Sequence, residues 1–556
     1  MKNNLQDIDI LLKNKKFESI KDMLEICSNE YENKIAFAYK TFNEVICNVT
    51  FREVNTIVSY FGNQLILNNI NKENCAIIGE LCFEWIITYF SVIATGGIVV
   101  PIDQNNSILK TKEIVEQSNC KFIFVTTKSY QKLYKDTFFS NKVFIIIDSL
   151  NMQDEIKKAI NLSKDSSVLN FSQYKTQFVD SDKVCEIVYT SGTTGLNKGV
   201  MLSQKNIIIN AIEANKLVDL TDRTMCFLPP HHTFCTTINI ITHYIRGSYV
   251  YISSGIKHLK NEIQYVRPKH LLLVPLFIEE FHRKIMNELK ENNTYENSFN
   301  KINNLKNNIT LSEKRKNFPI ITKIFGHNIE YLISGGAPLS QHIIDDFYNM
   351  GLPIINGYGI TECSPLISCN LVNHQTKNSV GIPLNCIDLK INTKNDANIG
   401  EIYVKSPCNF IGYYNNAKKT KNAFDNGYFK TGDIGYLNNN NLFIIGRANN
   451  MIVLSNGENI YPEELEKLIL NIDEVKEVMI KGVCNNKNKT ITMLEAIIVI
   501  NEDIIINSEI EQIKHNITKK IENLNQTLAY YKRISKITIR ETPFPRNSSH
   551  KIIRQN

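Results

Sequence analysis

Short, continuously apolar segments recur through the first half of the chain, and they constrain its fold more than any other feature of the sequence. Each is short enough for a β-strand and lacks the apolar/polar alternation of a sheet with one wet face. Continuous apolarity predicts strands buried on both faces, with the helical patterns between them covering the sheets. We therefore predict an α/β fold with strands at Cys75–Gly79, Ile98–Val100, Phe122–Val125, Val143–Ile147, Val184–Tyr189 and Leu271–Val274.

The length of the chain and a change of pattern near Arg447–Asn450 predict two domains. A chain of 556 residues exceeds what one hydrophobic core normally supports. Beyond the break, Pro462 suits the first turn of a helix, and strand-like Ile534–Ile539 lies near the end of the chain. Those elements suffice for an α+β unit of roughly a hundred residues. We predict a large N-terminal domain of layered α/β subdomains over residues 1–447 and a small α+β domain over residues 448–556.

Composition and charge exclude several other classes of protein. The net charge of +7 includes no basic run, which argues against a nucleic-acid groove, although a weak attraction to anionic substrates or a membrane surface stays open. Thirteen dispersed cysteines without zinc spacing, and an N-terminus without an apolar signal core, fit a reducing cytoplasm. The most apolar stretch, Trp85–Pro101, is short for a membrane span and predicts a buried helix that leads into a strand.

The segment Tyr189–Val200 (YTSGTTGLNKGV) carries the strongest functional signal. Glycines let backbone N–H groups approach an anion, hydroxyls donate to phosphate oxygens, and a lysine adds a mobile positive charge. The order of residues is not the Walker pattern. A simple turn in a surface loop is the alternative, but so dense a run favours a loop that binds polyphosphate. Its candidate residues are Thr190, Ser191, Gly192, Thr193, Thr194, Gly195 and Lys198.

This loop resembles the signature of the adenylate-forming superfamily, which includes acyl-CoA synthetases, luciferases and peptide-synthetase adenylation domains. The family usually has proline at the position of Asn197, and asparagine also favours turns. Further segments resemble the family's motifs in the same order, from about Phe51 to the C-terminus. They are Leu228–Phe234 (LPPHHTF), Ser334–Leu339 (SGGAPL), Asn356–Glu362 (NGYGITE), Tyr428–Gly435 (YFKTGDIG), Gly446–Arg447 and Pro545–Ile552 (PRNSSHKI).

The resemblance implies an adenine site built from two of these motifs. Two adjacent glycines in SGGAPL permit a close approach of the backbone to a flat ring, although a plain strand-to-helix turn is the alternative. In NGYGITE a tyrosine would stack on the base. The residues implied are Gly335, Gly336, Ala337, Pro338, Asn356, Gly357, Tyr358 and Gly359.

The resemblance also implies the groups that handle phosphate, ribose and acid. Thr361 would bond the α-phosphate, and Glu362 would hold Mg²⁺, a cation that prefers oxygen ligands. Asp433 would accept hydrogen bonds from the ribose hydroxyls, with Arg447 as a further ribose or phosphate contact. In the LPPHHTF segment, His232 would orient the carboxylate of the acid.

The C-terminal domain resembles the mobile domain of the family, which rotates on a hinge between two half-reactions. Asn449 matches the hinge, and Lys551 would bond the carboxylate and the α-phosphate during adenylation. Rotation would bring the segment around Gly457 toward a pantetheine tunnel. The family usually has threonine at Asn547 and glycine at His550, so the turn that delivers Lys551 would differ here.

Together these motifs imply an acid–thiol ligase with ATP, Mg²⁺ and coenzyme A, or the phosphopantetheine of a carrier protein, as cofactors. A carboxylate would attack the α-phosphate of ATP, and a thiol would then attack the acyl-adenylate. The HHTF segment and a long insertion before SGGAPL resemble long-chain fatty acyl-CoA synthetases, and Phe234–Thr236 offers no carboxylate to hold an amino group. A medium- or long-chain fatty acid is therefore expected. The alternatives are a fatty acyl–carrier-protein synthetase, an aryl-acid ligase and a non-catalytic nucleotide-binding relative.

Overall fold

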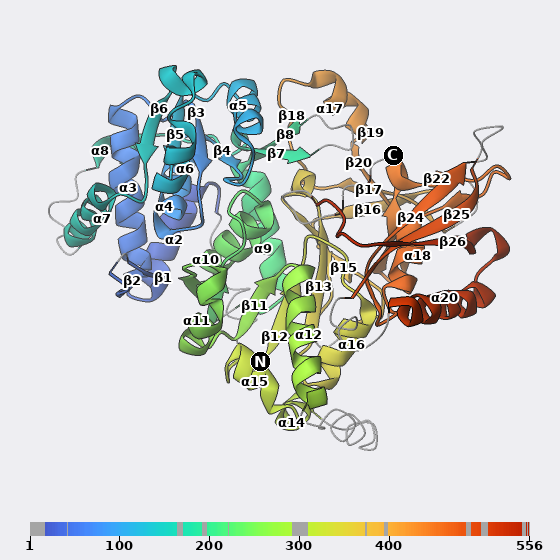
Figure 1. The fold of residues 1–556 in the computed structure, drawn as a ribbon. Coiled ribbons are helices and arrows are strands. Elements are labelled where there is room, and N and C mark those ends of the chain that lie inside the picture. The colour runs from blue at the N-terminus through green and yellow to red at the C-terminus, as the bar shows by residue number, and fades with distance from the viewer. Residues whose placement is uncertain are drawn as a thin grey trace.

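Five of the six predicted strands assemble into one seven-stranded sheet in the computed structural model (Figure 1), whereas the sixth, Leu271–Val274, is β11 of a second sheet. The order is β18-β8-β7-β4-β3-β5-β6, and β3 to β6 run parallel, whereas β7 and β8 form an antiparallel hairpin. The strands are β3 (Asn74–Ile78), β4 (Ile98–Ile102), β5 (Phe122–Val125), β6 (Val143–Ile146), β7 (Val184–Ser191), β8 (Asn197–Ser203) and β18 (Gly412–Tyr413).

The structure describes most of the chain. The described residues are 17–41, 43–163, 171–191, 197–220, 222–291, 310–372, 375–393, 398–484, 491–501, 510–546, 552 and 554.

Helices cover both faces of the seven-stranded sheet, as continuous apolarity predicts. Along β3, Cys75 and Ile77 pack in one core with α3 and α4, whereas Ala76 and Ile78 pack in another core with α5 and α6. All twelve residues of α4 are buried, and β4 follows, which confirms the prediction of a buried helix leading into a strand. The helices of this region are α2 (Ile20–Tyr31), α3 (Phe51–Leu67), α4 (Phe83–Ala94), α5 (Ile108–Gln117), α6 (Thr127–Leu133), α7 (Leu150–Ser163) and α8 (Ser172–Thr176).

A second sheet, of order β11-β12-β13-β14-β15, faces the first across a shared core. Leu272 and Ile333 belong to the same core as Cys75 and the buried helix α9, whereas Leu271 packs with α12 and α16 on the other face. The strands are β11 (His270–Leu273), β12 (Tyr331–Ser334), β13 (Ile354–Gly359), β14 (Leu366–Cys369) and β15 (Ile382–Pro383). The helices are α9 (Gln204–Leu217), the π-helix η2 (Phe234–Ile241), α10 (Thr242–Arg246), α11 (Leu259–Val266), α12 (Pro275–Glu291), α14 (Leu311–Lys316), α15 (Pro319–Phe325) and α16 (Gln341–Asn349).

Two further sheets complete the N-terminal region. One has the order β2-β1-β10-β9, and the other has the order β16-β17-β20-β19, with β21 paired to β20. Their strands are β1 (Ile35–Lys40), β2 (Ile46–Thr50), β9 (Arg223–Cys226), β10 (Tyr249–Ile252), β16 (Asp388–Asn392), β17 (Gly400–Lys405), β19 (Phe424–Asp425), β20 (Tyr428–Asn438) and β21 (Asn441–Arg447), and the short helix α17 (Ala417–Ala423) precedes β19.

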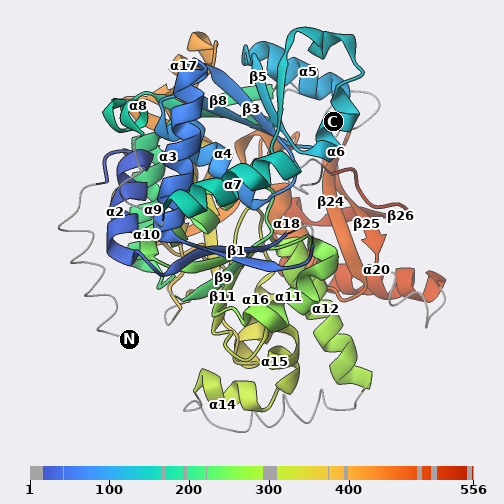
Figure 2. The ribbon, with the colours of Figure 1, turned by 90° about the vertical axis from the view of Figure 1, so that its left-hand side faces the viewer.

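The C-terminal part has a core of its own and lies to one side of the other sheets (Figure 2). Pro462 occupies the first turn of α18, as predicted, and Leu465 and Ile469 of that helix pack on the sheet β24-β25-β26. The elements are β22 (Ile452–Val453), β23 (Asn459–Ile460), α18 (Pro462–Ile469), β24 (Val475–Cys484), β25 (Ile491–Ile500), α20 (Ile510–Thr527) and β26 (Ile534–Arg540). A large α/β region followed by a smaller α+β region confirms the predicted fold class.

Within the described residues, no helix combines the length and the apolar character needed to cross a bilayer.

Candidate functional site

The segment predicted to bind polyphosphate is the tip of the hairpin between β7 and β8. The register pairs Thr190 with Lys198 and Ser191 with Asn197. Pairing of the two strands fixes the backbone of Thr190 and of Lys198 beside each other. Gly192, Thr193, Thr194 and Gly195 lie outside the described residues.

Lys198 and Glu362 meet at the ring of Tyr413. Strand β18 pairs with β8, with Tyr413 opposite Val200, and the Lys198 ammonium lies 5.4 Å from the centre of the tyrosine ring. The Tyr413 hydroxyl donates to Glu362 Oε1 at 3.0 Å. Burial and then the Glu362 charge raise the pKa of Tyr413, which keeps the phenol protonated as a donor.

A second lysine reaches the same ring from α17. The ammonium of Lys419 is 5.8 Å from the ring centre of Tyr413. The pKa of Lys419 is lowered overall, first by burial and then by the charge of Lys198, while the charge of Glu362 opposes this shift. The two lysines and the carboxylate therefore interact electrostatically. The sequence prediction missed both Tyr413 and Lys419, because neither lies in a segment that resembles a family motif.

A second cluster gathers Tyr358, Asp433 and Arg447. Asp433 on β20 lies opposite Arg447 on β21, and Arg447 Nε is 2.9 Å from Asp433 Oδ1. The Tyr358 hydroxyl donates to Asp433 Oδ2 at 2.6 Å. Asp433 is almost fully buried, and its charge is the main cause that raises the pKa of Arg447. The Arg447 guanidinium therefore stays charged at any physiological pH.

Asp433 keeps room for further hydrogen bonds although both of its oxygens are engaged. An ionised carboxylate has about four lone-pair sites, and Tyr358 and Arg447 use one each. The predicted role, acceptance of hydrogen bonds from two ribose hydroxyls, is compatible with this geometry. Tyr358 was predicted to stack on adenine, and in the structure its hydroxyl in addition fixes the carboxylate.

The two clusters are joined through the end of β13. Tyr358 lies in this strand, and Thr361 and Glu362 follow it in a short 3-10 helix, η4 (Thr361–Cys363). The charge of Glu362 also contributes to the raised pKa of Arg447. One strand end thus carries groups of both clusters.

The SGGAPL motif ends the neighbouring strand, β12. Parallel pairing sets Ser334 of β12 opposite Asn356 of β13, so the two motifs emerge from the same edge of the sheet. The carboxyl ends of parallel strands are where α/β sheets usually bind ligands. Gly335, Gly336, Ala337, Pro338, Asn356, Gly357, Tyr358 and Gly359 therefore lie together at this edge.

At Gly335, the carboxyl edge of this sheet contacts Phe234, which belongs to the LPPHHTF segment predicted to line the acid pocket. A Cβ atom at Gly335 would lie 2.9 Å from the tip of the Phe234 ring, so any larger residue here would require that ring to shift. Gly336 has a φ of +87°, a conformation that favours glycine.

His232 lies just before the π-helix η2. Its backbone N–H donates to the carbonyl of Pro229 at 3.2 Å, and its ring is 4.1 Å from the ring of His231. Burial lowers the pKa of His231 to about 4, so that neighbour is neutral at neutral pH. π-helical turns are frequent at functional sites, and this one places Cys235 and Thr236 in the core beside the sheet edge.

The residues predicted for the C-terminal domain are partly described. Asn449 lies in the 3-10 helix η5 (Ala448–Asn450), and the side-chain amide of Asn450 donates to Glu463 on α18. Gly457 has a φ of +85° and open space around it. Lys551, Asn547 and His550 lie outside the described residues.

The chain on both sides of Lys551 is anchored to the C-terminal part. Arg546 pairs with Glu477 on β24 at 2.7 Å, and Arg554 pairs with Glu466 on α18. These contacts tie the end of the chain to the body that was predicted to rotate.

The sequence matches models of a known enzyme family over most of its length. A model of the family described as AMP-binding enzyme matches residues 24–414, and one described as AMP-binding enzyme C-terminal domain matches residues 449–556. The chloroplastic long-chain-fatty-acid–[acyl-carrier-protein] ligase AEE15 of Arabidopsis thaliana is 22% identical, over 85% of this chain and 76% of its own. Long chain acyl-CoA synthetase 1 of the same plant is 27% identical, over 82% and 74%.

The solved structures with a similar fold include o-succinylbenzoate CoA synthetase (MenE) from Bacillus subtilis in complex with its acyl-adenylate intermediate. It matches with a TM-score of 0.71 and 21% identity, and the match covers 96% of each chain. At this identity the likeness shows the fold alone.

Proposed function

This chain belongs to the AMP-binding enzyme family and is an ATP-dependent, acid-activating ligase, and we propose that it joins a medium- or long-chain fatty acid to the thiol of coenzyme A. One observation supports the catalytic part of this proposal most. Segments that are distant in the sequence meet at the end of β13. One brings the ion pair of Asp433 and Arg447. The others bring the Glu362 carboxylate and, across the Tyr413 ring, the two lysines Lys198 and Lys419.

In the proposed reaction, the nucleoside of ATP binds at the carboxyl ends of β12 and β13. Asp433 accepts hydrogen bonds from the ribose, while Tyr358 and Arg447 hold its carboxylate in place. A carboxylate that is already oriented loses little entropy when the ligand binds. The base lies against Tyr358 and the glycines of the SGGAPL segment.

The phosphates lie toward Lys198, Thr361 and Glu362. Glu362 fits Mg²⁺, because Tyr413 uses Oε1 and, among the described residues, Oε2 receives no hydrogen bond. A bound Mg²⁺ would neutralise charge on the phosphates. Lys198 adds positive charge where pyrophosphate leaves. Both cations would lower the repulsion between the attacking carboxylate and the α-phosphate.

We further propose that residues 448–556 form the mobile domain and that Asn449 is its hinge. Asn450, bound to Glu463, would keep the hinge helix attached to α18 while the domain turns. Lys551 would bond the reacting carboxylate and α-phosphate in the first step. Rotation would then bring the open turn at Gly457 toward the thiol for the second step.

The acid is proposed from the chemistry of the pocket segment. His232 would orient the carboxylate, and the buried residues that follow it, Cys235 and Thr236, carry no charge that could hold an amino group. A neutral, apolar tail fits such a lining. One plant relative is named for long-chain fatty acids and the other for long-chain acyl groups, and both names favour the same class.

Two alternatives keep the same first step. The acyl-carrier-protein ligase among the relatives makes a carrier-protein thiol the second candidate acceptor. The fold shared with o-succinylbenzoate CoA synthetase keeps an aryl acid as a second candidate substrate. The cytoplasmic location and a weak membrane contact stay predictions from the sequence.

Pyrophosphate release with a panel of acids tests the proposal. Saturated fatty acids of increasing length, benzoate derivatives and amino acids should be compared at equal concentration with ATP and Mg²⁺, and then with coenzyme A or a phosphopantetheinylated carrier protein. The proposal expects acid-dependent release that is fastest with fatty acids and thioester formation with coenzyme A. Release with aryl acids only would contradict the substrate class, and no release with any acid would favour a non-catalytic relative.

A further inference from the structure

The structure contains two pairs of cysteines whose sulfur atoms lie close together, at almost the same separation within each pair. The Sγ atoms of Cys226 and Cys235 are 3.5 Å apart, and those of Cys386 and Cys408 are 3.6 Å apart. All four cysteines are free thiols in the structure. A disulfide bond holds its sulfur atoms about 2.05 Å apart, so either pair would need to close by roughly 1.5 Å.

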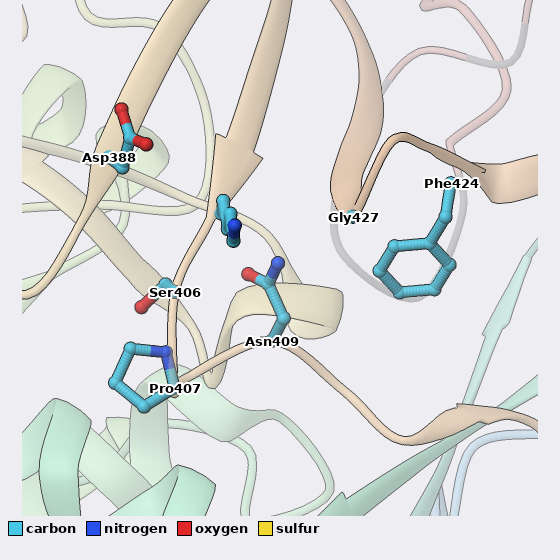
Figure 3. A pocket seen from close by; sticks show the side chains of 7 residues that line it. Asp388, Ser406, Pro407, Asn409, Phe424 and Gly427 are labelled. Carbon is cyan, nitrogen blue, oxygen red and sulfur yellow. The ribbon is translucent and has the colours of Figure 1, made fainter.

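The two pairs differ in their access to solvent. Cys226 and Cys235 are completely buried, whereas Cys386 is partly exposed in the turn between β15 and β16, and its partner Cys408 is buried. Pro407 and Asn409, the neighbours of Cys408, line an open pocket (Figure 3). Neither cysteine of the second pair lines this pocket, so a small, polar oxidant reaches the pair through the partly exposed Cys386.

The thiol of Cys386 is also the more easily ionised partner. A hydrogen bond with Cys408, together with one from Ser406, lowers the pKa of Cys386, whereas burial raises the pKa of the Cys235 thiol well above its usual range. The thiolate is the reactive form of cysteine. Exposure and ionisation favour the same sulfur atom, Cys386.

The loop that carries Cys408 is bonded to the segment of the proposed metal ligand. Phe410 N–H donates to the carbonyl of Glu362 at 2.8 Å, and the Ser364 hydroxyl donates to the carbonyl of Cys408 at 2.8 Å. On the other side, Asn206 of the buried helix α9 donates to the carbonyl of Pro407 at 2.7 Å. A shift of Cys408 therefore acts directly on the backbone around Glu362.

We propose that Cys386 and Cys408 form a peroxide-sensitive dithiol whose oxidation to a disulfide displaces the Glu362 segment and slows acid activation. The effect on activity rests on the function proposed above, whereas formation of the bond does not. The pair could not be predicted from the sequence, because its two cysteines are 22 residues apart and belong to no motif.

The chemistry needs a peroxide as the oxidant and balances as two steps. The Cys386 thiolate attacks one peroxide oxygen, the O–O bond breaks, and hydroxide leaves, which oxidises the sulfur to a sulfenic acid. The Cys408 sulfur then attacks the Cys386 sulfur, the S–O bond breaks, and the departing hydroxide takes up the thiol proton as water. Two thiols are oxidised in total and hydrogen peroxide is reduced to water. A dithiol reductant reverses the reaction.

Peptide mapping tests bond formation independently of activity. The full chain should carry Cys484→Ser, because Cys484 is exposed and could link two molecules. Trypsin separates the pair into peptides 378–390 and 406–418, whereas peptide 224–246 contains both Cys226 and Cys235. After treatment with hydrogen peroxide, we expect peptides 378–390 and 406–418 to be linked, peptide 224–246 to stay reduced, and dithiothreitol to undo the link. Absence of the link, or equal oxidation of peptide 224–246, would overturn the proposal.

The same samples test the effect on activity. Acid-dependent pyrophosphate release should fall roughly tenfold after oxidation, because small misplacements near reacting groups are costly, and it should recover with dithiothreitol. The Cys386→Ser variant should be as active as the reduced protein and insensitive to peroxide. Full activity of the linked protein would overturn the regulatory part. Absence of acid-dependent release from the reduced protein would instead count against the proposed function, and the mapping result would still decide the disulfide.

Discussion

The proposed nucleoside end and the proposed phosphate end of the site are built in opposite ways. At the nucleoside end, the buried carboxylate of Asp433 is held by a tyrosine hydroxyl at 2.6 Å and a guanidinium at 2.9 Å. At the phosphate end, the partly exposed Glu362 accepts a hydrogen bond from Tyr413, and the two lysines lie over the tyrosine ring more than 5 Å from its centre.

This contrast indicates which end is prepared before the substrate arrives. A buried charge costs less when it is paired, and the pairing fixes its geometry, whereas charges held apart gain most when a ligand of opposite charge enters. We infer that the nucleoside end is rigid and that the phosphate end is completed by ATP, Mg²⁺ and Lys551. The predictions below test the two ends separately.

The largest effect is expected at Lys551, which we assign to the phosphate end. Lys551→Ala should lower adenylate formation by ~10²-fold or more, because a preorganised charge at the reacting centre is lost. Thioester formation from a supplied acyl-adenylate should be largely retained. Single-turnover assays of each half-reaction measure both effects. An equal loss in both would contradict the assigned role.

Glu362→Gln should have the next largest effect. It removes the charge that we assign to Mg²⁺ while it keeps the size of the side chain, so the turnover number should fall by ~10²-fold and more Mg²⁺ should be needed. Tyr413→Phe is the matched control, since it deletes the hydrogen bond to Glu362 and leaves the carboxylate. If the control lost as much activity as Glu362→Gln, the hydrogen bond rather than the charge would be the important feature.

Asp433→Asn should weaken nucleotide binding by a factor of roughly 10 to 100, because hydrogen bonds to a charged group are worth about 1.5–3 kcal/mol. The loss should be similar for AMP and ATP, since both carry the ribose. Dissociation constants from calorimetry provide the measurement. A loss confined to ATP would place Asp433 at the phosphates.

Lys419→Ala should have a smaller effect, a rise of roughly fivefold in the KM for ATP, because a partly exposed charge contributes about 1 kcal/mol. Lys421→Ala, on the same helix, is the matched control, as Lys421 is exposed. Steady-state kinetics distinguish the two variants. An equal effect of both changes would mean that the general charge of α17, and not the position of Lys419, is responsible.

Glu186 is a useful reference for Asp433, because none of the described residues forms an ion pair with its carboxylate. It is buried in β7, accepts a hydrogen bond from Tyr89 at 3.2 Å, and burial raises its pKa to about 8. The folded state binds this proton more tightly than the unfolded state, so the carboxyl group lowers stability increasingly as pH rises through the weakly acidic range to about 8.

Glu186→Gln should change activity less than any variant above. The free energy of unfolding of this variant, relative to that of the unchanged protein, should rise by ~3 kcal/mol as the pH increases from 4 to 7. Chemical unfolding of both proteins at several pH values measures the difference. A difference that does not vary with pH would show that Glu186 ionises normally.

The sequence predicted the buried strands well because their continuous apolarity reflects burial on both faces. Short strands such as β15 and β18 could not be predicted, since their pairing partners and not their own residues make them strands. The π-helix η2 was also missed, because its apolar pattern does not differ from that of an α-helix.

Site residues were predicted individually, through their resemblance to family motifs, and not through their contacts with one another. Tyr358 and Asp433 are 75 residues apart, so their hydrogen bond follows from the tertiary fold alone. Tyr413 and Lys419 carry no motif and reach the site because β18 pairs with β8. The catalytic roles assigned to all of these residues stay predictions.

Calorimetric titration with AMP and with ATP plus Mg²⁺ tests the central claim most directly, on the unchanged protein and on Asp433→Asn and Glu362→Gln. If the nucleoside end is rigid and the phosphate end is completed by the ligand, Asp433→Asn should weaken binding of both nucleotides. Glu362→Gln should weaken binding of ATP with Mg²⁺ and leave binding of AMP without metal unchanged. Equal weakening of AMP binding by both variants would contradict the account.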